Sequence, residues 1–211
     1  MQRTLICVSH CDGADGAEVA RLVADELGLR YVDEEIVPAA ARRAGAAPEL
    51  VSDAEQRQPL LRRVLEELGA SGAAAMVAAG GIPPPVLAER PPPRGEELRR
   101  FISDAIEAVA SEGNVVIGSH GASFVLGGRD DLLRVFVTAP AGARARRLAA
   151  KRGMDEKEAE RQIRAADKSR ADYLKRSYDV DREDPTQYDL VVNTDALSPG
   201  EAAKIVAHAA G

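Results

Sequence analysis

The segment SHCDGADGAEVARLVADELG, Ser9–Gly28, sets the expected fold of the chain. It follows the short apolar run TLICVS, which is typical of a buried parallel strand. Two glycines, Gly13 and Gly16, come next, and apolar residues then recur at helical spacing until Gly28, a residue type that often ends a helix. The segment therefore predicts a strand, a glycine loop and a helix, the arrangement in which a helix N-terminus can hold an anion.

This loop lacks the lysine of a full phosphate-binding motif. That motif reads G-x-x-x-x-G-K-[ST], whereas the loop reads SHCDGADGAE and contains Asp12 and Asp15. A carboxylate about 4 Å from a phosphate oxygen is repelled by roughly 4 kcal/mol at an effective dielectric constant near 20. The helix dipole offsets only about 0.3–2 kcal/mol of this. A bound phosphate therefore requires Asp15 to point outward, or to bind Mg²⁺ together with Glu18.

Four further apolar runs are predicted to be strands, and helical patterns separate them. The strands are expected over 29–33 (LRYVD), 114–119 (NVVIGS), 132–139 (LLRVFVTA) and 188–194 (YDLVVNT), and the main helices over 96–111, 144–152, 155–178 and from 198 onward. Capping boxes, Asp155 with Glu158 and Ser198 with Glu201, mark the start of the last two helices. Five strands alternating with helices indicate a three-layer α/β fold with a parallel sheet, whose ligands bind at the carboxyl ends of the strands.

Composition and charge exclude several classes of protein. The 211 residues are 45% hydrophobic, which allows a real core, and two cysteines do not indicate a disulfide framework. No apolar run approaches the roughly 20 residues of a membrane span, and no secretory leader is visible. The net charge of −6 argues against a general nucleic-acid binder. We therefore expect a cytoplasmic protein that binds neither membrane nor nucleic acid.

The basic residues are concentrated in one part of the chain. Between 144 and 176 there are twelve Lys or Arg and six Asp or Glu, so this segment is positive within an acidic protein. Four of these cations share one face of the predicted helix over 155–178: Arg161, Arg164, Lys168 and Lys175. An anionic ligand would be drawn to such a segment. The alternative is a solvated helix of mixed charge that binds nothing.

The stretch from 69 to 95 differs from the rest in composition. It is rich in Ala, Gly and Pro, and the part GGIPPPVLAERPPPRG contains two proline triplets. Such triplets are incompatible with a helix interior or a central strand. We expect an extended surface excursion here, and the sequence leaves open whether it orders when a ligand binds.

The order of these motifs resembles the cytidylate kinase-like family. The resemblance rests on the loop pattern S-x-x-x-G-x-x-G-x-E-[IV]-A, on VVIGxxGAxFVL, on VFVTAP followed by arginines, on RxxDKxRADY and on YDLVVNT. It implies a P-loop NTPase-like fold in a single domain, 1–211. The core would be 1–33, 96–152 and 181–211, with a helical acceptor-binding insertion over about 34–95 and a helical lid over about 153–180.

The resemblance also assigns roles to individual residues. It implies binding of ATP and Mg²⁺ by the loop, catalysis by cations and an aspartate near the lid, and binding of a nucleoside monophosphate by a third group. The loop residues are Gly13, Ala14, Asp15, Gly16, Ala17 and Glu18; the catalytic residues are Arg144, Arg164, Asp167 and Arg170; the acceptor residues are Asp33, His120, Arg161 and Lys168; the metal ligands are Asp15 and Glu18. Asp167 would orient Arg164 and Arg170 through forked hydrogen bonds.

This chain departs from the family pattern at four of its positions. The family loop typically reads GSGGRE, but here Asp15 replaces a glycine and Ala17 replaces the arginine. Glu34 and His120 also stand where arginines are usual. Asp33 is equally a helix N-cap candidate, and His120 is equally a strand-end histidine bonded to a backbone carbonyl.

Three functions remain open from the sequence. The first is ATP-dependent phosphoryl transfer to a nucleoside monophosphate such as CMP or dCMP. The second is a kinase fold that has lost transfer and regulates by binding a nucleotide or a protein partner. The third is a kinase for a different small acceptor. The sequence also leaves open whether the chain is a monomer or a homodimer.

Overall fold

The computed structural model describes residues 3–44 and 95–211. These residues contain five parallel strands in the order β2-β3-β1-β4-β5. The strands are β1 (Leu5–His10), β2 (Arg30–Val32), β3 (Val115–Gly118), β4 (Leu132–Thr138) and β5 (Leu190–Asn193). All five lie where the sequence predicts them, so the predicted α/β fold with a five-stranded parallel sheet is confirmed.

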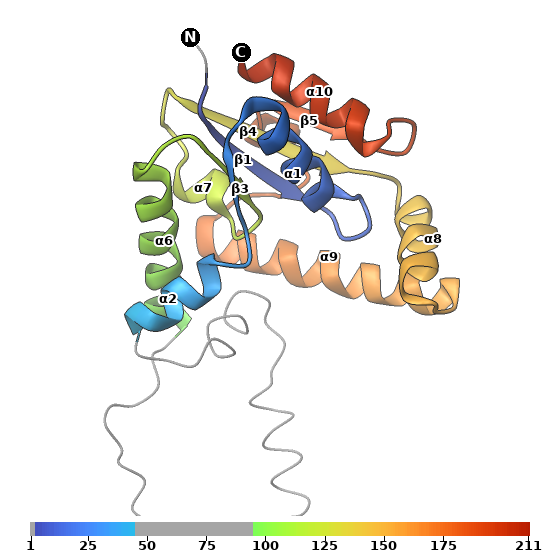
Figure 1. Cartoon of the computed structure of the whole chain (residues 1–211). Helices are drawn as coiled ribbons and strands as arrows, with labels where there is room; N and C mark the ends of the chain where they lie inside the picture. Colours follow the sequence, from blue (N-terminus) through green and yellow to red (C-terminus); the bar gives the residue numbers. More distant parts are fainter. Residues whose placement is uncertain (1–2, 45–94) are drawn as a thin grey trace, which may run out of the picture.

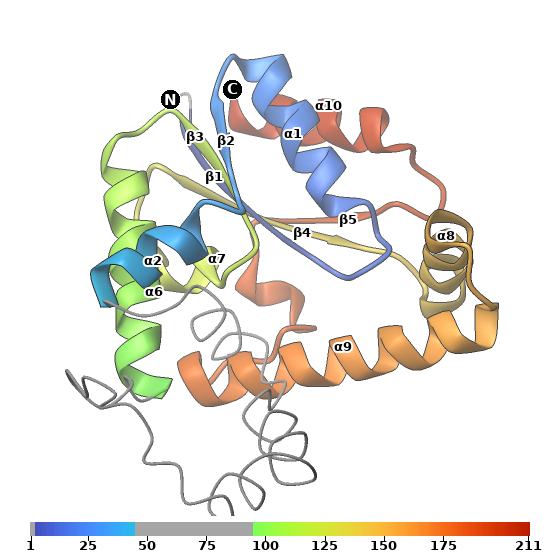
Figure 2. The same cartoon turned by 60° about the horizontal axis from the view of Figure 1, so that its bottom comes forward.

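Helices cover both faces of this sheet (Figures 1 and 2). One face carries α1 (Gly16–Leu27) and α10 (Pro199–Ala210); the other carries α2 (Ile36–Ala44), α6 (Gly95–Ser111) and α7 (Ala122–Val125). Side chains of β1 point alternately to the two faces of the sheet. Ile6 packs in the core beneath α1 and α10, and Leu5 packs in the core beneath α2, α6 and α7. The paired apolar layers explain why the strands are continuous apolar runs.

A helical hairpin extends past the carboxyl ends of the strands. It consists of α8 (Ala141–Arg152) and α9 (Glu156–Tyr178), joined around Gly153, whose φ of 63° is left-handed. A small core containing Leu148 and Ile163 holds the two helices together. Figure 1 shows α9 running across the molecule below the sheet, so that one helix passes beneath several strand ends.

Two capping boxes were predicted, and the structure contains one of them in full and half of the other. Ser198 and Glu201 form the reciprocal capping box of α10. Asp155 caps α9, but its carboxylate accepts the N–H of Lys157, while Glu158 contacts Arg161 and Gln162 instead of closing the box. The expected Asp155–Glu158 box is therefore corrected to a single-sided cap.

Two short helical elements lie outside the pattern that the sequence predicts. Helix α7 and the 3₁₀ turn η1 (Pro185–Gln187) were not predicted, because each is too short to show an apolar period. Most of the expected insertion, including the proline triplets, lies outside the described residues. Within the described ranges, no helix combines the length and apolar character needed to cross a membrane.

Candidate functional site

The loop between β1 and α1 is shaped by two glycines that neighbouring groups crowd. Gly13 has a left-handed φ of 77°, and a Cβ atom there would lie 2.6 Å from the carbonyl oxygen of Arg144. At Gly16 a Cβ atom would lie 2.1 Å from the Cβ of His10. Larger residues are therefore excluded at both positions, as in loops whose backbone closely approaches a phosphate. The N–H groups at the first turn of α1 supply the donors such an anion needs.

The negative charge of Asp15 in this loop is paired with an arginine. It is the N-cap of α1 with a left-handed φ of 56°, and its carboxylate Oδ2 lies 3.6 Å from Nε of Arg147. Arg147 also donates to the hydroxyl and the carbonyl of Thr194, the residue after β5. The repulsion expected between Asp15 and a phosphate is therefore opposed by a cation held in place from α8.

Asp167, on α9, is joined to two buried arginines. Its two carboxylate oxygens accept from Nη2 and Nη1 of Arg144 at 2.7 and 3.2 Å. Arg182 adds a third contact at 3.4 Å, and the side chains of both arginines are only 7% exposed. The predicted fork between Asp167 and Arg164 is wrong, because Arg164 contacts Glu160 on the exposed side of the helix.

The same two arginines reach the phosphate-loop candidate. Arg144 donates to the carbonyl of Asp12, and Arg182 donates to the carbonyl of His10 at 2.6 Å. Burial opposes the charge on Arg144, but the hydrogen bonds to Asp167 and the nearby negative charges of Asp167 and Asp12 together raise the pKa of the guanidinium above its ordinary value. The result is a continuous connection from the loop after β1 through two cations to α9.

Arg182 was not singled out by the sequence. It lies in the turn between α9 and β5, where the letters DREDP suggest only a polar connection. Its guanidinium carbon lies 5.6 Å from the centre of the Phe136 ring, which supports the buried position. Neither contact leaves a periodic signal, so only the three-dimensional structure identifies this residue.

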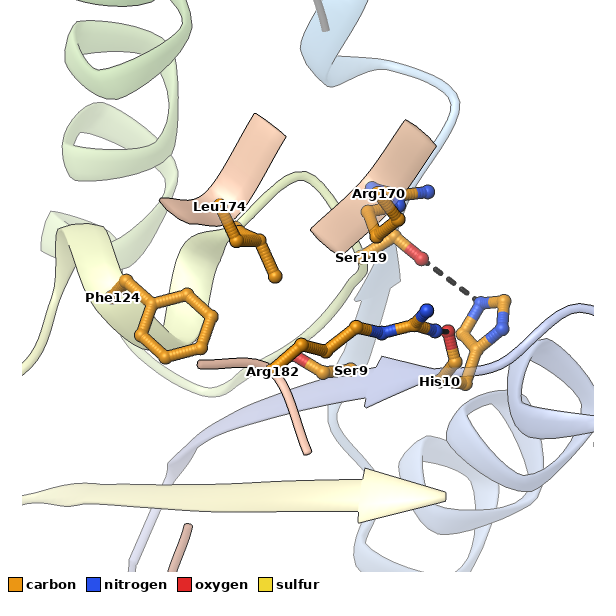
Figure 3. Close-up of a pocket in the computed structure, with 8 residues that line it drawn as sticks. Ser9, His10, Ser119, Phe124, Arg170, Leu174 and Arg182 are labelled. Carbon is orange, nitrogen blue, oxygen red and sulfur yellow. Dashed lines mark hydrogen bonds between the residues drawn. The ribbon is translucent and has the colours of Figure 1, made fainter. Parts of the chain in front are cut away.

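A pocket opens between the ends of β1 and β3 and the inner face of α9. Figure 3 shows the residues that line it: Ser9, His10, Ser119, Gly121, Phe124, Arg170, Leu174 and Arg182. Predicted residue Arg170 is therefore placed beside the loop, and His10 and Ser119 are contributed by two neighbouring strand ends. Positive charge and hydroxyl donors thus gather at the carboxyl edge of the sheet, where such folds bind ligands.

Asp33 and His120, both predicted for the acceptor site, contact each other directly. Nε2 of His120 lies 3.0 Å from Oδ1 of Asp33, and the hydroxyl of Tyr31 donates to Oδ2 at 2.7 Å. Burial would raise the pKa of Asp33, but the two hydrogen bonds outweigh it and hold that pKa below its ordinary value. An ionised carboxylate with both oxygens engaged therefore lies at the end of β2.

The predicted cationic stripe of α9 faces away from this pocket. Arg161 pairs with Glu158, Arg164 with Glu160 at 3.3 Å and Lys168 with Asp172 at 3.2 Å; Lys175 pairs with Asp179 at 2.6 Å. These four cationic side chains are between 65% and 78% exposed. In this conformation the stripe matches the solvated-helix alternative, and the substrate roles of Arg161 and Lys168 stay predictions.

Asp15 and Glu18, the predicted metal ligands, lie at the start of α1 in different surroundings. Within residues 3–44 and 95–211, no three His, Cys, Asp or Glu side chains gather closely enough to hold an ion. Asp15 is engaged by Arg147, whereas Glu18 is exposed on the first turn of α1. Because Mg²⁺ in kinases is commonly held by one or two carboxylates together with phosphates, the donor set fits an ion that arrives with a nucleotide.

The chain matches a family model and sequence relatives. The model of the cytidylate kinase-like family matches residues 5–196. A cytidylate kinase of Ignicoccus hospitalis is 26% identical over 196 residues, covering 93% of this chain and 92% of that protein. A cytidylate kinase of Methanopyrus kandleri is 35% identical over 105 residues, so the chain spans 54% of the length of that relative.

Solved structures agree on the fold. An uncharacterized protein from Eubacterium ventriosum aligns with a TM-score of 0.66 at 14% identity, over 98% of this chain and 97% of that chain. A shikimate kinase from Bacteroides thetaiotaomicron aligns with a TM-score of 0.52 at 17% identity, over 97% and 96%. These neighbours share the fold of this chain. The extent of the family match shows that the chain belongs to the cytidylate kinase-like family.

Proposed function

We propose that the protein transfers a phosphoryl group from ATP to a nucleoside monophosphate such as CMP or dCMP. The observation that carries this proposal is the connection of Asp167 through Arg144 and Arg182 to the loop carbonyls of Asp12 and His10. Phosphoryl transfer depends on positioning and on charge stabilisation. Two buried arginines held between Asp167 of α9 and the glycine loop supply both at one place.

The donor side follows from the loop. In the proposed complex, the N–H groups at the start of α1 receive the phosphates, and Gly13 and Gly16 allow the close approach. Arg170 lines the pocket beside the loop and adds charge near the group in transfer. Glu18 would help hold Mg²⁺, which neutralises phosphate charge when bound.

The acceptor side involves Asp33 and His120. Their pair at the ends of β2 and β3 borders the same edge of the sheet as the pocket. A histidine can donate to a phosphate, and an ionised aspartate can accept from a sugar or base. The part of the chain predicted to complete the acceptor site, 45–94, lies outside the described residues.

Two alternatives have specific support. Ala17 provides no cation on the loop, and Arg161 and Arg164 are paired within α9, which favours a protein that binds nucleotide without transfer. Glu34 and His120, where the family pattern has arginines, favour a different acceptor. A cytoplasmic location and the oligomeric state stay predictions of the sequence.

Calorimetric titration with ATP, with and without Mg²⁺, followed by ADP release in the presence of CMP, dCMP and other nucleotide acceptors, separates these functions. The proposal expects Mg²⁺-dependent ATP binding and ADP release that depends on CMP or dCMP. ATP binding without turnover on any nucleotide acceptor contradicts transfer to a nucleotide. Asp130→Asn, on the exposed turn before β4, is the matched control and should leave both readouts unchanged.

A further inference from the structure

Ser119 has an unusual position at the edge of the proposed site. It directly follows β3, its φ is 56°, and its N–H donates to the carbonyl of Val8 on β1 at 2.9 Å. A left-handed backbone is uncommon for a residue with a side chain and often marks a functional turn. The bond to β1 fixes Ser119 beside the start of the glycine loop.

The Ser119 hydroxyl contacts an imidazole. Its Oγ lies 2.9 Å from Nε2 of His10 (Figure 3). Nδ1 of His10 lies 3.5 Å from the carbonyl of Cys11. The tautomer with the proton on Nδ1 satisfies both contacts, because Nε2 can then accept the serine proton. Oγ is thereby oriented as a donor to a base, the relation found in activated serine nucleophiles.

The surroundings keep this imidazole unprotonated. Burial, and after it the nearby charge of Arg170, lower the pKa of His10, while the hydrogen bond to the Cys11 carbonyl and the charges of Asp33 and Asp12 oppose the shift more weakly. At neutral pH His10 is therefore available as a proton acceptor. Arg182, which donates to the carbonyl of His10, lines the same pocket with Arg170 and adds to the positive charge around the hydroxyl.

His10 also lies directly on the glycine loop. A Cβ atom at Gly16 would lie 2.1 Å from Cβ and 2.5 Å from Cγ of His10, so the histidine packs against the first residue of α1. The first turn of α1 is where the proposed function places the phosphates. The serine and its base are consequently at the phosphate end of the site, beside the group that would be transferred.

We propose that Ser119 accepts the terminal phosphoryl group of a bound nucleoside triphosphate, with His10 as the base. Oγ of Ser119 forms a bond to the γ-phosphorus, the bond from that phosphorus to the β,γ-bridging oxygen breaks, and the nucleoside diphosphate leaves. The serine proton passes to Nε2 of His10. Arg170 and Arg182 stabilise the charge of the group in transfer. The inference rests on the proposed function only for the identity of the donor.

The experiment incubates the full chain with ATP and Mg²⁺, without any acceptor, and measures phosphoryl incorporation by intact mass and by sequencing of phosphopeptides. Up to one group per chain is expected, on Ser119. Ser119→Gly removes the hydroxyl and suits the positive φ, so it should abolish incorporation. Ser123→Ala is the matched control, because its hydroxyl contacts Ser9 instead of His10, and it should be labelled like the wild type.

His10→Gln tests the base. Glutamine can keep a hydrogen bond to Ser119 but does not take up the proton, so incorporation should slow by about 100-fold or more. An equal rate in His10→Gln, or a label on any other residue that persists in Ser119→Gly, overturns the inference.

The proposed function is tested separately, by calorimetric ATP binding and by phosphoryl transfer to CMP. Transfer to CMP with no phosphoserine overturns the inference and leaves the proposed function standing. Phosphoserine at residue 119 with no transfer to any nucleotide supports the inference and contradicts the proposed function. An absence of ATP binding contradicts both.

Discussion

The two faces of α9 both carry charged residues, but these residues pair with different partners. The outer face carries Arg161, Arg164 and Lys168, each paired with an acidic residue of the same helix and largely exposed. The inner face carries Asp167 and Arg170, and Asp167 binds arginines that come from α8 and from the turn before β5. An ion pair within one helix does not constrain the other elements. An ion pair between two elements fixes how those elements lie relative to each other.

This difference shows which charges to associate with function. Intrahelical pairs at spacings of three or four are worth only about 0.2–0.5 kcal/mol and are screened by salt. Asp167 joins two arginines whose side chains are 7% exposed. Removing its charge costs more stability, because it leaves two buried guanidinium groups without their carboxylate. The inner face therefore positions the proposed site, and the outer face keeps the helix solvated.

The largest expected effect comes from removing the charge of Asp167. Asp167→Asn should lower the free energy of unfolding by about 3 kcal/mol, the lower end of the range for breaking a buried pair, because Asp167 itself is 26% exposed. Urea unfolding measures this. Asp172→Asn, the matched change on the outer face, should cost no more than about 0.5 kcal/mol. Equal losses in the two variants would remove the distinction between the faces.

The next effect concerns the loop that the inner face supports. Asp15→Gly combined with Ala17→Arg removes a carboxylate and adds a guanidinium at the start of α1. ATP affinity should rise at least about tenfold, since a hydrogen bond to a charged group contributes about 1.5–3 kcal/mol. Asp15→Gly alone should do less, because Arg147 already opposes that charge. Calorimetry that finds no gain in the double variant would show that the loop is not the nucleotide site.

A smaller effect is the pH dependence due to His10, the residue that Arg170 faces. Its pKa in the folded chain is below the ordinary value of 6.5, so the unfolded chain binds a proton that the folded chain does not. The contribution to stability is present above pH 6.5 and is lost as the pH falls, with a slope of at most about 1.4 kcal/mol per pH unit. His10→Gln should flatten the unfolding free energy between pH 5 and 7 relative to wild type. An unchanged slope contradicts the assignment.

The fold could be predicted from the sequence because its signals are local. The five apolar runs and the glycines that end α1 and α8 each follow from a short stretch of residues, and the structure confirms them. Short elements such as α7 were missed because four residues span barely one helical turn. Asp33 and His120 each come after a predicted strand, so their place at the carboxyl ends of the strands was expected, whereas the role of Arg170 rested on the family resemblance.

The site could be predicted only in part because its contacts join residues far apart in the chain. Arg182 binds the carbonyl of His10, and Ser119 binds the His10 ring, without any spacing in the sequence that indicates either contact. The helical spacing of Arg161, Arg164 and Lys168 correctly predicts a shared face. It does not say that this face is the one turned to solvent, which depends on how Ile163 packs against α8.

The most direct test of the proposed nucleotide site compares ATP affinity, measured by calorimetry, in Arg170→Ala and Arg164→Ala. Both arginines lie on α9, but Arg170 lines the pocket, whereas Arg164 is exposed and contacts Glu160. Arg170→Ala should weaken ATP binding by about tenfold or more, while Arg164→Ala should change it by less than about twofold. A loss confined to Arg164→Ala, or equal losses in both, would contradict the claim that the inner face of α9 builds the nucleotide site.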